Sequence, residues 1–234
     1  MRHTTSAIAA LIVATVVGLA ASGGDPDKDP AMEKQLWDAR HLIDSKNPAA
    51  AIPKCDVIVN SYKAYYGARK EKIYCSRSGP ETLGSLLTAV HDTKGAIALS
   101  STWADAYYLK SYALQDLRRL SEAKATLQLA LKLSPFNSQY LGELGEIYAL
   151  EKNWPQAMKA FKEAEDNAKL APDETRADEL GRVRRGQGYV LVELGKLDEA
   201  EKKYQQCLAA NPNDAKAKAE LQYVREQKAK GKAR

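Results

Sequence analysis

The stretch GKLDEAEKKYQQCLAANP, residues 195–212, repeats the pattern of RRLSEAKATLQLALKLSP, residues 118–135. Each has a leucine, an alanine three residues later, a large apolar residue four further on, a small residue three beyond that, and a closing proline. A spacing of four and then three residues places side chains on one face of a helix. A pattern written twice in one chain indicates a helical unit that packs on copies of itself.

A third copy lies between these two stretches. The apolar sets of the three copies are Ala123, Leu127 and Ala130; Ala157, Phe161 and Ala164; and Ala200, Tyr204 and Cys207. Each set follows another helical stretch, and these upstream stretches span residues 105–117, 138–150 and 175–194. Each upstream stretch carries a small residue that allows two helices to approach closely: Ser111, Gly145 and Gly188. The sequence therefore predicts three helical hairpins.

These segments, 104–137, 138 to about 171 and about 181 to 214, resemble tetratricopeptide repeats, most clearly in ALKLSPFN and LGKLDEAEKKYQQCLAANPND. Lys110, Arg184 and Gln187 depart from the apolar residues usual in that family. The alanine-to-alanine step is 34 residues at first and 43 afterwards, so a lengthened hairpin is expected near 165–181, with Pro172 starting its second arm. The resemblance implies an all-α, helix-turn-helix solenoid over residues 103–214.

The rest of the chain is expected to be helical but less regular. Residues 24–102 are interpreted as a degenerate repeat, with helices over 32–43, from Pro48 to Gly67, and from Pro80 onward. The segment GAIALS, residues 95–100, is either extended or a packed loop. Residues 215–234 are expected to form a capping helix and a basic tail, since a solenoid needs an end with one solvated face.

Residues 1–23 have the order of a secretory signal peptide. A weakly basic start is followed by 14 uncharged, mostly apolar residues, 7–20, and then by small residues before Asp25. This run is shorter than the roughly 20 residues of a spanning helix, and no basic cluster follows it. We therefore expect cleavage near Ala20, Ala21 or Gly23, a periplasmic or secreted protein, and no stable membrane insertion after signal removal.

The net charge of +5 does not indicate a nucleic-acid partner. Residues 216–234 hold seven basic and two acidic residues, which account for the whole excess. The remaining chain is close to neutral and offers no broad basic surface to a phosphate backbone. The basic tail is interpreted as the solvated end of the last helix.

The sequence shows no convincing catalytic or metal-binding set, and no cofactor is expected. Cys75, His91 and Asp92 could be drawn as a thiol, base and orienting carboxylate, but a structural cysteine and a surface histidine are favoured. In an exported protein Cys55 and Cys75 are the one pair considered for a disulfide. Cys207 is expected to be a packed, inert thiol.

The family resemblance implies a concave groove, lined by the first helix of each pair, that binds a protein or peptide. The groove residues it implies are Asp105, Tyr108, Tyr112, Gln115, Glu146, Arg182, Arg185 and Tyr189. An alternative for Tyr108 and Tyr112 is packing between neighbouring helices. The leading function is a non-catalytic scaffold or adaptor of the bacterial cell envelope. The alternatives are an immunity-type inhibitor of a toxin or hydrolase and, third, a thiol-dependent enzyme using Cys75.

Overall fold

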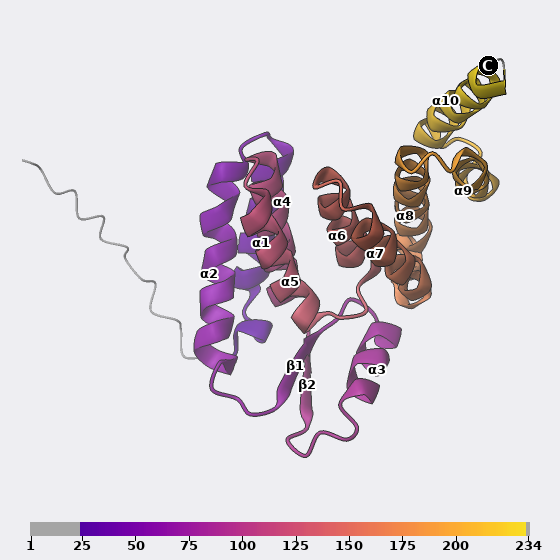
Figure 1. The fold of residues 1–234 in the computed structure, drawn as a ribbon. Helices are drawn as coiled ribbons and strands as arrows, with labels where there is room; N and C mark the ends of the chain where they lie inside the picture. Colours follow the sequence, from indigo (N-terminus) through magenta and orange to yellow (C-terminus); the bar gives the residue numbers. More distant parts are fainter. Residues whose placement is uncertain (1–23, 233–234) are drawn as a thin grey trace, which may run out of the picture.

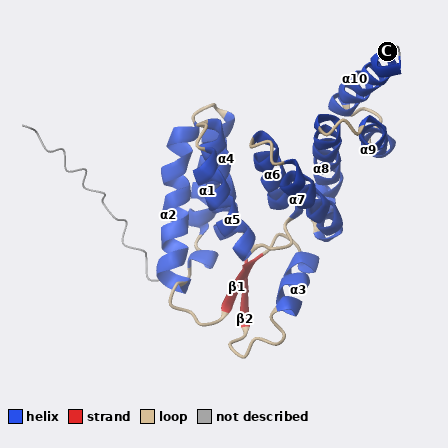
Figure 2. Cartoon of the chain, in the orientation of Figure 1, coloured by secondary structure: helices blue, strands red, loops and turns tan. Residues whose placement is uncertain are grey.

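Ten α-helices and two short strands make up the part of the chain that the structure, a computed structural model, describes: residues 24–232 (Figure 1). The expected signal peptide lies outside these residues. The helices are α1 (Pro30–Asp44), α2 (Pro48–Tyr66), α3 (Gly79–Thr88), α4 (Thr102–Asp116), α5 (Leu120–Leu133), α6 (Ser138–Leu150), α7 (Trp154–Asn167), α8 (Asp173–Glu193), α9 (Leu197–Ala210) and α10 (Ala215–Lys232). Figure 2 shows the two strands, β1 (Lys72–Cys75) and β2 (Ala96–Leu99), below the helices. The all-α solenoid class is confirmed, and none of the described helices is long and apolar enough to cross a membrane.

Four helical hairpins, not three, follow one another along the solenoid: α1–α2, α4–α5, α6–α7 and α8–α9. One residue with a left-handed backbone closes the first helix of each hairpin, with φ between 57° and 72°: Lys46, Arg118, Lys152 and Gly195. The next N–H then donates back to a carbonyl five residues earlier, as in Asn47 to Leu42 and Lys196 to Leu191, both at 2.8 Å. This pairing satisfies the carbonyls that a helix end leaves free.

The first hairpin has the repeat spacing that its sequence conceals. Pro48 starts α2, and Ala51, Cys55 and Ile58 follow at the same intervals of three, four and three, all fully buried. Cys55 thus takes the place of Leu127, because a buried thiol packs as a small apolar group. Residues 30–66 form a regular unit, which corrects the description of 24–102 as one degenerate repeat.

The left-handed turns allow a prediction about the free energy of unfolding. Lys152→Gly is expected to raise the free energy of unfolding by about 0.5–1 kcal/mol, because glycine avoids the steric penalty of a Cβ at positive φ. The Lys152 side chain is exposed, so its removal should cost little. Gly195→Ala should lower the same quantity by about 1 kcal/mol. Urea unfolding would contradict this account if Lys152→Gly were the less stable protein and Gly195→Ala were neutral.

Residues 67–101, called the insert below, separate the first two hairpins and were not recognised as a unit in the sequence. β1 and β2 pair in parallel, with Lys72 opposite Ala96 and Cys75 opposite Leu99, and α3 forms the crossover between them. A parallel pair requires such a connection. The strand β2 lies within GAIALS, so the extended alternative for that segment is the one observed.

The insert rests on the loops between the later hairpins. The Ser134 hydroxyl donates to the Cys75 carbonyl at 2.6 Å, and the Ser78 hydroxyl donates to the Leu170 carbonyl at 2.6 Å. Gly84 approaches the Phe136 ring closely enough that an added Cβ would lie 3.4 Å from it. These contacts tie a segment near residue 80 to loops that follow it by 50 to 90 residues.

The extra residues expected near 165–181 form a 3₁₀ turn (Ala168–Leu170) between the third and fourth hairpins and lengthen α8, the first helix of the fourth, at its start. This lengthened part carries Glu179, which accepts from Arg77 of the insert with an oxygen–nitrogen distance of 2.7 Å. Arg77 also pairs with Glu81 at 2.7 Å. The two departures from the 34-residue period, the insert and the longer α8, therefore contact one another through Arg77.

The three polar departures from the family pattern have partners. Lys110 pairs with Asp56 of the preceding hairpin at 2.5 Å. Arg184 and Gln187 both donate to Glu165 of α7, at 2.8 and 3.0 Å. Each replaces an apolar contact between neighbouring helices with a charge-assisted hydrogen bond.

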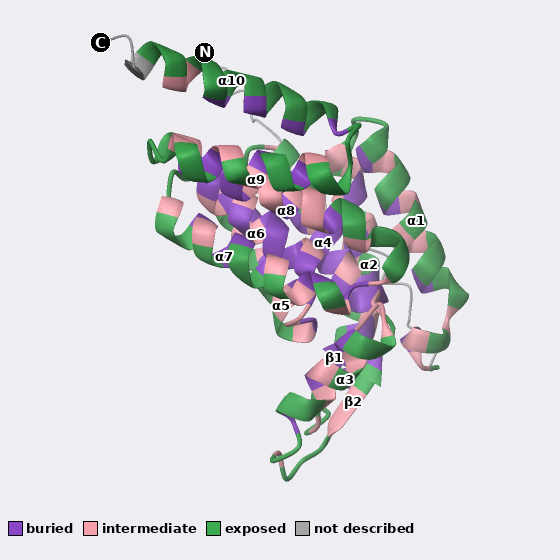
Figure 3. Ribbon diagram, turned by 90° about the vertical axis from the view of Figure 1, so that its right-hand side faces the viewer, coloured by how far each residue is buried: buried purple, intermediate pink, exposed green. Residues whose placement is uncertain are grey.

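Buried residues occur along the whole solenoid (Figure 3) and form three hydrophobic clusters that follow one another along it. The N-terminal half packs aromatic rings from α2, α4 and α6; Tyr62 stacks on Trp103 with ring centroids 5.4 Å apart. Further along, Phe161 and Tyr204 are each fully buried, and each meets a glycine of a facing helix. Glycine at these positions leaves the space that the ring occupies.

Candidate binding groove

A hollow of about 260 Å³ lies between α4 and α6, on the side where the first helices of the hairpins face one another. Its walls carry an exposed tyrosine, an exposed leucine and several charged groups: Tyr112, Gln115, Asp116, Arg118, Glu143, Glu146 and Leu150. Tyr112 is 37% exposed and Leu150 is 55% exposed. Five of the seven lining residues are polar or charged, so the hollow is a mainly polar surface on which Tyr112 and Leu150 supply the apolar contact area.

Arg182 of α8 fixes the two glutamates of this hollow. Its guanidinium donates to Glu143 at 2.5 Å and to Glu146 at 2.7 and 2.9 Å. Gln115 of α4 donates to the other oxygen of Glu143 at 2.8 Å. Burial raises the pKa of Glu143, against the opposing effect of Arg182. The hydrogen-bonded chain from Gln115 through Glu143 to Arg182 thus links α4, α6 and α8 at the floor of the hollow.

Two of the expected groove residues, Asp105 and Tyr108, contact Tyr140 of α6 and do not face the hollow. The Tyr140 hydroxyl donates to Asp105 at 2.6 Å. Tyr108 is 6% exposed and stacks on the Tyr140 ring at 5.0 Å, and burial raises its pKa to about 12. For Tyr108 the packing alternative is therefore the correct one, whereas Tyr112, one helical turn later, faces the hollow.

The expected groove residues of α8 divide between two roles. Arg185 pairs with Asp214 in the turn before α10, so its charge serves the cap and is not free for a partner. Tyr189 is 44% exposed and lies edge-on to the Trp154 ring at 6.1 Å. The structure thus gathers Tyr112, Gln115 and Glu146, with Arg182 behind them, and places Tyr189 apart.

Four lining residues were missed in the sequence: Asp116, Arg118, Glu143 and Leu150. Of these four, only Leu150 could have been predicted from the sequence. It stands at the end of the first helix of its hairpin, outside the buried stripe of the repeat, so an exposed position could have been expected. Glu143 occupies a position that faces the preceding repeat, where an apolar side chain is expected. Nothing in the sequence indicated that Gln115 and Arg182 would satisfy its charge.

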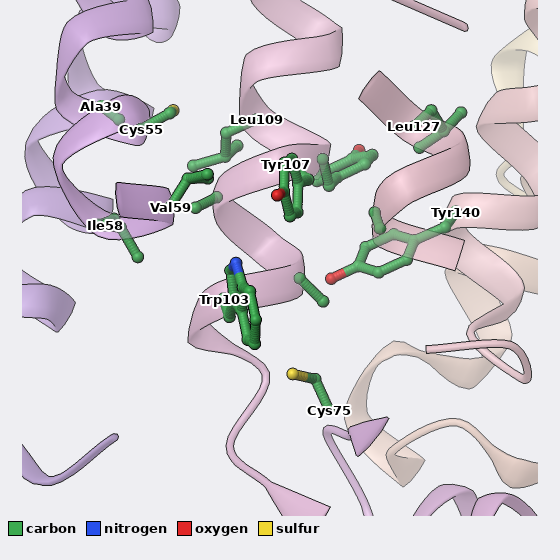
Figure 4. Packing of buried hydrophobic residues seen from close by; sticks show 14 of the residues in the cluster. Ala39, Cys55, Ile58, Val59, Cys75, Trp103, Tyr107, Leu109, Leu127 and Tyr140 are labelled. Atoms are coloured by element: carbon green, nitrogen blue, oxygen red, sulfur yellow. The ribbon is translucent and has the colours of Figure 1, made fainter. Parts of the chain in front are cut away.

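The disulfide considered between Cys55 and Cys75 is not formed; both are buried free thiols, as is Cys207. Cys55 faces α1 near Ala39, whereas Cys75 lies beyond Trp103 at the end of β1 (Figure 4). Burial raises the pKa of Cys55 to about 12 and also raises that of Cys75. His91 is exposed beyond the opposite end of α3, and Asp92 pairs with Lys72 at 3.3 Å. The structure therefore does not assemble a Cys75–His91–Asp92 site.

The Glu165 cluster gives a prediction of pH dependence. Burial opposes the charge on Glu165, but donors from Arg184, Lys203 and Gln187 outweigh it and lower its pKa from 4.5 to about 2. A carboxyl with a depressed pKa stabilises the fold above its unfolded pKa and loses that effect as pH falls through the folded value. Wild type should exceed Glu165→Gln in free energy of unfolding by roughly 2 kcal/mol at pH 7. Urea titrations should show that difference narrowing between about pH 4.5 and 2; a constant difference would contradict it.

Models of the tetratricopeptide repeat family match residues 108–173 and 186–214. The chain contains tetratricopeptide repeats. The matches cover the second to fourth hairpins, and the α1–α2 hairpin extends the same tetratricopeptide geometry toward the N-terminus. Domains of this family bind proteins or peptides, so the family supports a protein-interaction scaffold.

Solved structures show the same fold at low sequence identity. PilF of Pseudomonas aeruginosa aligns over 86% of this chain and 71% of its own length, with 15% identity and a TM-score of 0.60. MamA, residues 41 to the end, from Desulfovibrio magneticus RS-1 aligns over 91% and 90%, with 12% identity and a TM-score of 0.54. A comparison with curated protein sequences gave no significant match. At these identities the likeness to PilF and MamA concerns the tetratricopeptide fold alone.

Proposed function

We propose that this protein is a non-catalytic adaptor of the bacterial cell envelope that holds a loop or extended peptide of a protein partner between α4 and α6. The observation that carries the proposal is the hollow beside Tyr112 and Leu150, whose apolar groups remain exposed while its glutamates are held by Arg182. Rigid aromatic side chains contribute interface energy at a low cost in conformational entropy. The envelope location rests on the expected signal peptide.

The chemistry of the described residues supports a role without catalysis. Burial raises the pKa of all three thiols, which makes each a poor nucleophile. Among residues 24–232 no three His, Cys, Asp or Glu side chains are grouped so as to hold a metal ion. A groove of fixed charges and exposed apolar groups is suited to recognition.

The test is affinity capture from the envelope fraction with matched variants. Tyr112→Ala combined with Leu150→Ala should reduce recovery of a specific partner by tenfold or more, since central aromatic and apolar contacts dominate interface energy, at about 1.4 kcal/mol per factor of ten. Leu129→Ala is the control, because Leu129 on α5 has the same 37% exposure as Tyr112 but lies outside the hollow. Equal recovery by all three proteins, at unchanged thermal stability, would contradict the proposal.

A further inference from the structure

The helix α3 is amphipathic, but its apolar face points outward. It buries Glu81, Ser85 and Ala89 against the rest of the protein. Two of its leucines, and Val90 in the turn that follows the helix, are among the most exposed of the described residues: Leu83 at 60%, Leu87 at 61% and Val90 at 65%. Leu83 and Leu87 lie four residues apart on one face of α3, and Val90 follows them in the turn after the helix ends. These three residues are called the stripe below. In Figure 3 the insert projects from the helical body, so the stripe is accessible.

Basic side chains surround the free end of the insert, where the loops before β1 and after α3 meet. The Lys72 N–H donates to the Gly95 carbonyl at 3.1 Å, which brings these two loops together. This tip, residues 68–72 and 91–95, holds four basic residues, Arg69, Lys70, Lys72 and Lys94, against Glu71 and Asp92. Its basic side chains are exposed, whereas Asp92 is half-buried against Lys72.

The chain before α1 is fixed at the base of the insert, at the opposite end of the strands from the basic tip. Asp25 accepts from the Tyr66 hydroxyl at the end of α2, and Asp27 accepts from Ser100, directly after β2, at 2.6 Å. Tyr66 directly precedes the insert, and Ser100 lies near its C-terminal end.

We propose that the insert docks on an anionic lipid surface, with Leu83, Leu87 and Val90 at the boundary of headgroups and acyl chains. An apolar helical stripe beside basic residues is the composition of an interfacial membrane contact. Anionic lipid attracts each nearby lysine or arginine by about 1 kcal/mol. A second copy of the chain is disfavoured, because these three side chains are a small part of the about 800 Å² per partner that a stable interface buries.

This docking is independent of the α4–α6 groove, which lies on other helices. It would orient the solenoid with its insert facing the membrane and leave the hollow open to a partner. The contact is peripheral, since the stripe lies on one short helix and the turn after it, and no helix of the described residues spans a bilayer. Its strength should fall with ionic strength, because exposed charges are screened by salt.

A fluorescent probe on α3 tests the proposal in the full chain. Val90→Cys can be labelled selectively with a nitrobenzoxadiazole thiol reagent, since the three native thiols are buried. Vesicles of phosphatidylcholine with phosphatidylglycerol should shift its emission to the blue and increase it several-fold. A probe at Lys159→Cys on α7, exposed and outside the insert, should not respond, which separates insertion of α3 from tethering through residues 1–23.

Matched variants define the result further. In the Val90→Cys background, Leu83→Ser with Leu87→Ser should weaken vesicle binding by roughly tenfold, whereas Leu194→Ser, an exposed leucine outside the insert, should not. Lys70→Glu and Lys94→Glu should each weaken binding at least about fivefold. An absent response, an equal response at Lys159→Cys, or a response that rises with protein concentration without vesicles would overturn the proposal, the last by indicating a second copy.

Discussion

Gly186→Ala is expected to lower the free energy of unfolding by about 2–3 kcal/mol, although alanine normally stabilises a helix relative to glycine. A Cβ at position 186 would lie 2.4 Å from the Phe161 ring, and one at Gly145 would lie 2.6 Å from the same ring. Phe161 is 1% exposed and is held between α6 and α8 by these two glycines. The ring has no free space to move into, so the clash displaces a helix.

Gly181→Ala on the same helix is the matched control for Gly186→Ala. Its Cβ would meet only the flexible end of Arg185 at 3.3 Å, so it should raise stability by about 0.5–1 kcal/mol. Combining Gly186→Ala with Phe161→Leu should recover part of the loss, because a smaller side chain relieves the contact. Calorimetry or urea unfolding that ranks the two alanine variants as equally stable would show that Phe161 is not confined as described.

Arg77→Ala is expected to cost about 3–5 kcal/mol, because it leaves two buried carboxylates without their counter-charge. The side chains of Glu81 and Glu179 are 3% and 9% exposed, and the Arg77 guanidinium contacts both. Burial opposes the charge of Glu179, and donors from Arg77 and Ser138 lower its pKa. Since Arg77 joins the insert to the extension of α8, its loss should release the insert first. Hydrogen exchange across residues 72–99 should therefore accelerate more than exchange in α9.

Arg119→Ala provides the comparison for Arg77→Ala. Arg119 forms a bidentate pair with Glu122, but both side chains are about half exposed, and such surface pairs add little to the free energy of unfolding. A loss for Arg77→Ala no larger than that for Arg119→Ala would contradict the view that Arg77 holds the insert on the solenoid.

The repeat spacing of residues 103–214 was predictable from sequence because each hairpin depends on local rules. Leu, Ala, a large apolar residue and a small residue at fixed intervals define a helix face, and proline or glycine ends the unit. The first hairpin escaped recognition because Cys55 replaces the large apolar residue and Lys46 replaces glycine at the left-handed turn. The insert escaped because its strands have four residues each, and their pairing joins segments more than 20 residues apart.

The candidate groove was only partly predictable, since periodicity gives the face of a helix but not the depth of a side chain. Tyr112, Gln115 and Glu146 face the hollow as the family pattern implies. Tyr108 and Asp105 are on the same helical face, yet Tyr140 from the next repeat covers both. Arg185 is drawn away by Asp214, a residue 29 positions later. These outcomes depend on contacts between repeats, which no local pattern encodes.

Site-specific photo-crosslinking in cells tests the central claim, that the α4–α6 hollow is where a protein partner binds. A photoreactive amino acid at position 112 or 150 should give a defined cross-linked product with one protein. The same group at position 129, equally exposed in the native protein but on α5, should give none. Products from 112 and 150 alone are the predicted result. Products from 129 at equal yield, or none from 112 and 150, would contradict it.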